Sequence, residues 1–276
     1  MTYVQIRPKG TRLGNWMFQY AAAKSAFPDD EISFVIEDCS DWPKVEKFKV
    51  LFPDVIITNH VPDEAGFRTG LYQDVKYLSP DVLDRLFHCP TEIAESLENK
   101  FGRLLKNDKL VSIHVRRGDY LILPHRHPFV GEAYLKKAVA RFADMPNVEF
   151  IVCSDDIAWC KEFFTERRFP GLRFNYSENN SVIEDLFLMR SSRGGHVCSN
   201  STFSWWGAYR SSSPQPLTIF PSMWYGIAIQ GGCRGLYFDG SEVINNGYTF
   251  GRMVHAVAMM TKNWLGRVLR KIGVVK

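Results

Sequence analysis

The chain has 276 residues, of which 45% are hydrophobic and 23% are charged, and its formal net charge is +4. This length suffices for one large domain or two of ordinary size, and the composition is that of a globular protein. So mild a positive charge excludes the basic footprint of a nucleic-acid-binding protein, but it suits a local site for an anionic ligand.

We expect a cytoplasmic protein. The N-terminus, MTYVQIRPKGTRLGN, lacks the apolar core of a secretory signal, and the longest uncharged run, 211–233, contains three prolines and three glycines, which a membrane-spanning helix would not tolerate. The six cysteines form no C-x-x-C pair, so buried, reduced thiols are expected. The N-glycosylation sequons at Asn175, Asn179 and Asn200 then have no function, and Asn200 falls in a predicted core segment.

The first hundred residues mix helical and strand patterns. The apolar spacing predicts helices over 14–27 and 91–105 and strands over 31–36 and 52–58. The polar stretch KNDK, residues 106–109, is interpreted as a linker. These elements predict an α/β domain over residues 1–108.

From Lys109 onward, strands and helices alternate regularly. Alternation of this kind predicts right-handed crossovers and a parallel sheet, and hence a Rossmann-like domain over 109–260. The predicted strands are 110–115, 148–154, 172–177, 196–200 and 217–221, and the predicted helices are 132–142, 156–167, 182–192 and 202–211. The basic, amphipathic stretch 261–276 is predicted as a C-terminal helix that either makes weak peripheral contact with a membrane or packs on the N-terminal domain.

Polar residues follow the predicted strands at their carboxyl ends, where open parallel sheets bind ligands. The first strand is followed by Arg116 and Arg117, and a guanidinium can hold a phosphate with two hydrogen bonds. The alternation of side chains along a strand directs the two arginines to opposite faces, so we expect one to meet the ligand and the other to form a structural salt bridge. Neither G-x-G-x-x-G nor a P-loop lysine motif is present to cradle a diphosphate by itself.

Other residues near these strand ends support an anion site. Ser201 and Thr202 stand where a strand gives way to a helix, so either can cap a helix start that attracts anions. Asp155 and Asp156 are helix N-terminal acids by default and possible ribose ligands by position. Asp185, beside Glu184 in an apolar helix, could accept paired N–H bonds from a purine. We predict no metal site, because D-x-D and H-E-x-x-H are absent and His125 and His127 have no carboxylates nearby in the sequence.

Four motifs, in order, resemble the α-1,2-fucosyltransferases of glycosyltransferase family 11: TRLGNWMFQYA, HVRRGDY, CSDDIAWC and NSTFSWWGAY. The resemblance covers nearly the whole chain. It implies a GT-B-like fold with two Rossmann-like domains facing each other across a cleft, residues 1–108 on the acceptor side. It also implies GDP-fucose as donor substrate, a β-galactoside glycan as acceptor, inversion at the anomeric carbon, and no cofactor or metal. The chain departs from the family's usual GRLGNQMFQYA, with Thr11 in place of Gly and Trp16 in place of Gln.

The resemblance also implies roles for individual residues. Arg116 would hold the β-phosphate with help from Ser201 and Thr202, and Arg117 would belong to the same donor site. His114 and Asp185 would face the guanine, and Ser154 and Asp155 the ribose. Gly14 and Asn15 would approach the phosphates or the glycosidic oxygen, and Tyr120, His127 and Trp16 would contact the acceptor.

The general base stays open between two residues. Asp119 is near the right place, but a carboxylate beside two arginines is a poor base and could instead orient Arg117 or the acceptor. A histidine of the 125–127 loop is the second candidate. Two other functions stay open: a fucosyltransferase of another linkage or related GDP-sugar, and a non-catalytic module that binds glycans or sugar nucleotides.

Overall fold

The computed structural model describes residues 2–5, 11–36, 42–59, 70–211, 214–229, 233–247 and 249–271. The chain folds into two compact units. Unit 1 comprises residues 1–102 with the short segments 180–187 and 234–238, and unit 2 comprises 103–179, 188–233 and 239–276. The main boundary lies between Gly102 and Arg103, six residues before the position predicted from KNDK, and that stretch forms a turn in which Asn107 accepts a hydrogen bond from the amide of Lys109.

Unit 1 is built on a three-stranded parallel sheet. Its strands are β1 (Thr2–Gln5), β2 (Ile32–Val35) and β3 (Ile56–Thr58), in the order β1-β2-β3. Its helices are α1 (Leu13–Ala26), α2 (Trp42–Leu51), α3 (Pro80–Leu86) and most of α4 (Thr91–Leu105), with short 3-10 turns at Val75–Tyr77 and Arg234–Leu236. The core is aromatic, because Tyr20, Phe34, Phe48 and Phe52 pack ring against ring.

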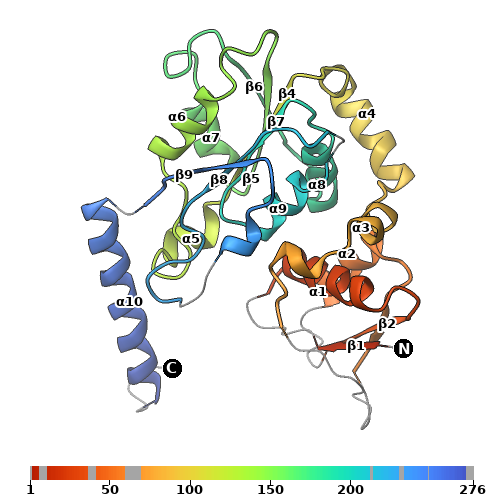
Figure 1. Cartoon of the computed structure of the whole chain (residues 1–276). Helices are drawn as coiled ribbons and strands as arrows, with labels where there is room; N and C mark the ends of the chain where they lie inside the picture. The colour runs from red at the N-terminus through yellow and green to blue at the C-terminus, as the bar shows by residue number, and fades with distance from the viewer. Residues whose placement is uncertain are drawn as a thin grey trace. The chain divides into compact units, whose positions relative to one another are not determined.

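Unit 2 contains a six-stranded parallel sheet in the order β6-β5-β4-β7-β8-β9 (Figure 1). Its strands are β4 (Leu110–Val115), β5 (Glu149–Ser154), β6 (Arg173–Tyr176), β7 (Gly195–Val197), β8 (Thr218–Pro221) and β9 (Ser241–Ile244). All six residues of β4 are buried, as expected for a central strand covered on both faces. Two α/β units, each with a parallel sheet, confirm the predicted α/β class.

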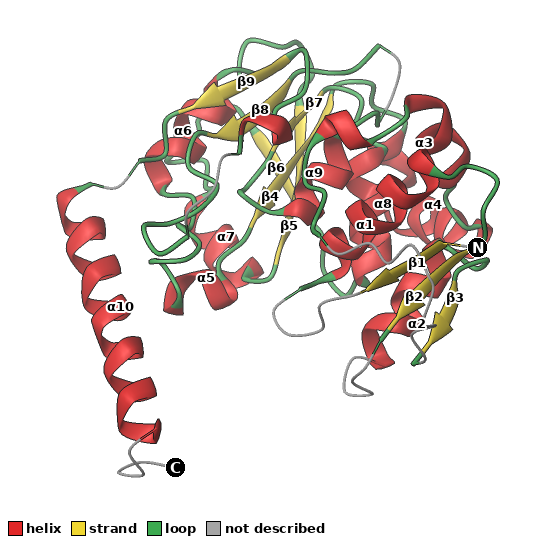
Figure 2. Ribbon diagram, turned by 60° about the horizontal axis from the view of Figure 1, so that its bottom comes forward, coloured by secondary structure: helices red, strands yellow, loops and turns green. Residues whose placement is uncertain are grey.

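Helices cover both faces of the unit 2 sheet (Figure 2). The helices of this part of the chain are α5 (Gly118–Ile122), α6 (Glu132–Ala140), α7 (Ile157–Phe163), α8 (Val182–Arg190), α9 (Thr202–Ala208) and α10 (Phe250–Lys271). Side chains of α6 and α7 form one hydrophobic core with Val111, Ile113 and Val115 of β4. On the other face, Gly207 of α9 lies against Met189 of α8.

Two features at the C-terminal end differ from the sequence prediction. Strand β9 was not predicted, and the last helix begins at Phe250 rather than at residue 261. The contacts of α10 described below are with residues of unit 2. No helix in the described ranges is both long and apolar enough to cross a membrane.

The cysteines are only partly as predicted. Cys160 and Cys198 are buried thiols, and burial raises the pKa of Cys160 to about 11 and that of Cys198 further still. Cys89 is exposed, contrary to the expectation of burial. Cys39 lies outside the described residues.

Candidate active site

The strand order places a topological switch point between β4 and β7. The chain passes from β4 outward to β5 and β6, then returns to the other side of β4 with β7 and continues outward to β8 and β9. In sheets of this kind the crevice outside the carboxyl ends of the two central strands binds ligands. Arg116 follows β4 directly and Cys198 follows β7, so the candidate residues that come after these two strands, such as Arg116 and Ser201, stand at this point.

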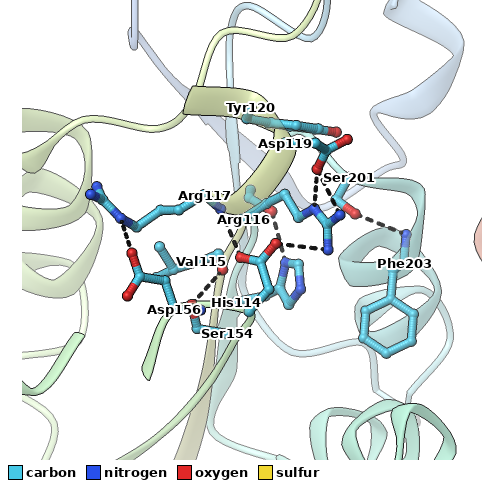
Figure 3. A network of polar contacts seen from close by, with 12 residues as sticks. His114, Val115, Arg116, Arg117, Asp119, Tyr120, Ser154, Asp156, Ser201 and Phe203 are labelled. Carbon is cyan, nitrogen blue, oxygen red and sulfur yellow. Dashed lines mark hydrogen bonds and ion pairs between the residues drawn. The ribbon is translucent and has the colours of Figure 1, made fainter. Parts of the chain in front are cut away.

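Alternation along β4 decides which side chains can reach the site. Val111, Ile113 and Val115 enter the core with α6 and α7. Because successive strand residues point to opposite faces, His114 lies on the other face. The same alternation past the strand end separates Arg116 from Arg117, and Figure 3 shows these two side chains directed to opposite sides.

Arg116 is held by two carboxylates and an aromatic ring. Its Nε and Nη2 both donate to Oδ1 of Asp119, at 3.1 and 2.7 Å, and its Nη1 is 2.9 Å from Oδ2 of Asp155. Its Cζ lies 5.8 Å from the centre of the Tyr120 ring. The hydrogen bonds to Asp119 use two of the five guanidinium N–H groups, and Nη1 is ion-paired with Asp155, so within the part of the chain that the structure describes N–H groups are left that can donate to an anionic ligand. The guanidinium is therefore oriented in advance and still has hydrogen-bonding capacity.

Arg117 turns away from this arrangement. Its Nε donates to Oδ2 of Asp156 at 2.9 Å, and its Cζ lies 3.9 Å above the Trp159 ring. The hydrogen bond from Arg117 lowers the pKa of Asp156, although burial opposes this effect. The structural salt bridge expected of one arginine is thus found at Arg117. This placement differs from the donor contact predicted for it.

Asp155 joins the two arginines. Its Oδ1 accepts the backbone amide of Arg117 at 2.8 Å, while its Oδ2 pairs with Arg116. A Cβ atom built on Gly118 would lie 2.5 Å from that Oδ2, so only glycine allows the carboxylate to approach this closely. Gly118 could not be selected from the sequence, because nothing in the order R-R-G-D indicates that a carboxylate following another strand packs there. Asp155 was predicted to face the ribose, whereas in the structure both of its oxygens contact arginines.

Ser154 links the ends of β4 and β5. Its hydroxyl donates to the carbonyl of Val115 at 2.8 Å and accepts the amide of Asp156 at 2.9 Å. Asp156 in turn caps α7 by accepting the amide of Trp159 at 3.2 Å. The predicted ribose contact of Ser154 therefore competes with two hydrogen bonds that fix the position of the Asp155–Asp156 segment.

His114 is a buried, neutral imidazole beneath the site. Its Nδ1 is 2.7 Å from Oγ of Ser199, and its ring lies 5.5 Å from that of Phe203. Burial disfavours the imidazolium and lowers the pKa of His114 to about 4, although the Asp155 carboxylate partly opposes this. At neutral pH the ring offers one N–H donor and one acceptor. Ser199 was not selected from the sequence, where it stands in a run of small polar residues.

Tyr120 and His127 stack beside Arg116. Their ring centres are 4.9 Å apart and their planes differ by 15°. The Tyr120 hydroxyl donates to the carbonyl of Asn200 at 3.0 Å, which ties α5 to the segment that follows β7. Burial raises the pKa of Tyr120, so this hydroxyl stays protonated. Burial, followed by the charge of Arg126, lowers the pKa of His127.

The segment after β7 forms a short, well-capped helix. Ser201 is the N-cap of α9, and its hydroxyl accepts the amide of Phe203 at 3.3 Å. Ser204 donates to the carbonyls of Ser199 and Ser201. Thr202 is the first helical residue. Of the two residues predicted as possible caps of this helix, Ser201 is therefore the N-cap and Thr202 is not.

The predicted residues of unit 1 lie on α1. Gly14 is buried, and Asn15 is half-buried with its Oδ1 accepting from Nε2 of Gln73 at 2.7 Å. Trp16 is fully buried, which does not favour the acceptor contact predicted for it. Its indole packs edge-on against Phe48, and its Nε1 donates to Oγ1 of Thr11 at 3.1 Å. The two departures from the usual family motif thus form a hydrogen bond with each other.

Asp185 and Glu184 occupy the first turn of α8, within unit 1. Asp185 is half-buried, while Glu184 is buried and binds Lys100 and Ser96 of α4. Burial alone would raise the pKa of Glu184, but hydrogen bonds from Lys100, Ser96 and Ser181 outweigh it and lower the pKa to about 2. Glu184 is a structural acid, and Asp185 is the less buried of the pair.

The strand ends of unit 2 thus bring together a charged guanidinium, a neutral buried imidazole and a stacked Tyr–His pair. Such an arrangement suits an anion bound through Arg116 and a flat heterocycle or sugar against the rings. Among the residues that the structure describes, no group of three or more His, Cys, Asp and Glu side chains could hold a metal ion.

Comparisons with known proteins relate the chain to glycosyltransferases. Over 161 residues the chain is 30% identical to an Escherichia coli alpha-1,2-colitosyltransferase, a match covering 56% of this chain and 55% of that one. It is 34% identical over 103 residues to the galactoside 2-alpha-L-fucosyltransferase Sec1 of Mus musculus, covering 36% of this chain and 28% of that one. The matched segments thus span about half or less of these relatives.

The fold also has a solved counterpart. The apo form of POFUT1 covers 79% of this chain and 97% of its own, with a TM-score of 0.50 and 13% identity, and so supports the fold alone. Residues 39–225, more than half of the chain, match the family described as Glycosyl transferase family 11. The chain belongs to glycosyl transferase family 11.

Proposed function

We propose that the protein transfers L-fucose from GDP-fucose to the 2-hydroxyl of a terminal β-galactoside, with inversion at the anomeric carbon and without a metal ion. The observation that carries this proposal is Arg116, held by hydrogen bonds to Asp119 and an ion pair to Asp155 at the switch point, with N–H groups left to donate among the described residues. Family membership and the relative that acts as a galactoside 2-alpha-L-fucosyltransferase support the sugar and the linkage.

The reaction is a single displacement. The acceptor oxygen forms a bond to C1 of fucose as the bond from C1 to the β-phosphate oxygen breaks, and the electron pair leaves with GDP. Negative charge therefore accumulates on the β-phosphate in the transition state. A guanidinium that is already oriented binds this charge more strongly than it binds the donor in the ground state, which lowers the barrier.

The acceptor hydroxyl must also lose its proton. Asp119 accepts two hydrogen bonds from Arg116, an arrangement that favours orientation of the arginine over proton abstraction. His127, stacked on Tyr120 and with its pKa lowered by burial, is neutral at physiological pH and can accept a proton. We assign the base to His127 and the positioning of Arg116 to Asp119.

The test is substitution of Arg116 in the full chain. Loss of a transition-state donor of this kind costs about 3 kcal/mol or more, so Arg116→Ala should lower kcat at least about a hundredfold. Arg116→Lys should also fail, because an ammonium group cannot replace the planar fork. Arg193→Ala, at an exposed arginine paired with Asp108, is the matched control and should leave kcat unchanged. Near-normal turnover by a folded Arg116→Ala variant would contradict the proposal.

A second donor is favoured by one observation, the 30% identity to an alpha-1,2-colitosyltransferase. Colitose is fucose without its 3-hydroxyl, so both GDP-sugars place the same diphosphate on Arg116. A comparison of kcat/KM for the two donors on one β-galactoside decides between them, and NMR of the product identifies the linkage. If GDP is released with neither donor, the chain is a binding module rather than an enzyme.

A further inference from the structure

Helix α10 presents its apolar side to solvent. Phe250 is 87% exposed and Trp264 is 57% exposed, and Met253, Val254, Val257 and Leu265 are exposed as well. The spacing of these residues, close to i, i+3, i+4, i+7 and i+14, places them on one face of the helix. A helix on a globular protein normally turns such an apolar face to the core, whereas α10 turns it to solvent.

The opposite side of α10 contacts unit 2 through mainly polar residues. Arg252 donates to the carbonyl of Phe129 and stacks on its ring, with Cζ 4.5 Å from the ring centre. Asn263 Nδ2 is 3.3 Å from Nε2 of His125, and Ala256 is fully buried. These contacts fix which face of the helix is turned outward.

The charge of α10 indicates what covers the exposed face. The 22 residues Phe250–Lys271 contain five Lys and Arg and no Asp or Glu. Lys262 and Arg267 are exposed and flank the apolar stripe. A second copy of the chain would bring an equally positive helix, and like charges would repel along the contact. An anionic lipid surface instead complements both the charge and the apolar stripe.

We propose that α10 docks the protein on an anionic membrane surface, lying in the plane of the interface with Phe250, Val254, Val257 and Trp264 inserted at the boundary between headgroups and acyl chains. At 1.5 Å per residue the helix offers a contact about 33 Å long. Lys262 and Arg267 meet the headgroups. This inference uses no residue of the proposed active site and does not depend on the proposed function.

The experiment is flotation of the full chain with vesicles of phosphatidylcholine mixed with phosphatidylglycerol, compared with vesicles of phosphatidylcholine alone. We expect the protein to float with the mixed vesicles and to bind the neutral vesicles about tenfold more weakly. Binding to the mixed vesicles should decrease at high salt. Val254→Glu/Val257→Glu should lower binding at least about tenfold. Val50→Glu is the matched control, because Val50 of α2 is 48% exposed and Val257 is 43% exposed.

The charge contribution has its own pair of variants. Lys262→Glu/Arg267→Glu should abolish the preference for anionic vesicles, while Lys136→Glu/Lys137→Glu, exposed on α6, should keep it. Circular dichroism verifies that each variant is folded. Equal binding to both vesicle types, no binding, or equal loss in Val50→Glu would overturn the proposal. A dimer detected by light scattering would also overturn the proposal if the α10 variants dissociate it. The exposed face of α10 would then bind a second copy of the chain.

Discussion

Gly118 controls the distance between two charged groups of the candidate site. Gly118→Ala would push the Asp155 carboxylate away from Arg116, since the new methyl group would lie 2.5 Å from Oδ2. Weakening this ion pair by about 1.5 kcal/mol predicts roughly a tenfold lower kcat. Gly251→Ala is the control, because no heavy atom lies within 4 Å of its added Cβ, and its kcat should not change. Steady-state kinetics of both variants make the comparison.

His127 makes a prediction about pH. Its pKa is lowered by burial, so the base form is present above that pKa and is lost as the pH falls through it, below 6.5. We expect kcat/KM to decrease on this acidic side and His127→Gln to lose that dependence together with most of the activity. Asp119→Asn should keep the acidic limb and raise KM for the donor. An unchanged acidic limb in His127→Gln would assign the base elsewhere.

For individual residues, the sequence predicts the direction of a side chain better than it predicts the residues that this side chain contacts. Alternation along a strand correctly separates Arg116 from Arg117, because that rule depends only on backbone geometry. The burial of Trp16 could not be inferred, since a tryptophan at a helix start suits either a core or a ligand surface. The closeness of Gly118 to Asp155 depends on how two strands lie side by side, which no local pattern contains.

Helix α1 depends on a buried hydrogen bond that can be measured. Thr11→Val removes the acceptor of the Trp16 indole N–H while keeping the side-chain shape, and it should lower the free energy of unfolding by about 1–3 kcal/mol. Trp16→Phe removes the donor. The double variant should cost less than the sum of the two single changes, because each removes the same bond. Urea denaturation followed by circular dichroism gives the cycle, and simple additivity would show that the bond contributes nothing.

Glu184 of α8 contacts Lys100 and Ser96 of α4, and its carboxylate makes the stability of the fold depend on pH. Glu184 has its pKa lowered to about 2 in the folded protein, from 4.5. A lowered pKa stabilises the fold above pH 4.5, and this contribution is lost as the pH falls from 4.5 toward 2. Glu184→Gln should therefore be less stable than the unmodified chain at pH 7, and the difference should shrink over that window. A constant difference in thermal midpoint across the window would contradict this account.

Helices and strands are predicted correctly where the pattern of apolar residues in the sequence matches the pattern of buried side chains in the structure. Strand β4 and helix α4 have the predicted bounds, because the first is an unbroken apolar run and the second a regular amphipathic repeat. Strand β9 was missed, since its four residues at a sheet edge include Ser241 and Glu242 and leave no apolar run. Helix α10 begins at Phe250, where Thr249 caps its first turn through the amide of Arg252 at 3.4 Å.

For the whole molecule, nucleotide binding should be visible as a gain in stability. A ligand that binds only the folded state at a hundred times its Kd stabilises the protein by about 2.7 kcal/mol. Saturating GDP should therefore raise the thermal midpoint, EDTA should not reduce this rise, and Arg116→Ala should abolish most of it. A rise that requires a divalent cation would refute the metal-free proposal.

Sequence patterns predict the alternation of strands and helices in unit 2 but not the order of strands in the sheet. That order depends on which side of β4 each crossover takes, so sequence patterns predict ligand binding only at the carboxyl ends of strands in general. The order β6-β5-β4-β7-β8-β9 narrows the location to the ends of β4 and β7. Likewise, the division into two units includes residues 180–187 and 234–238 in unit 1, far along the chain from the rest of it.

On the proposed function, the two carboxylates around Arg116 have a consequence for the catalytic cycle. Asp119 and Asp155 act as internal counterions, so the arginine is never left as a bare charge when the nucleotide is absent. In the proposed reaction an incoming diphosphate would share the guanidinium with them, which would limit how tightly GDP is retained. On the proposed function these internal pairs would be ready to form again when GDP departs, so that release leaves no uncompensated charge at Arg116.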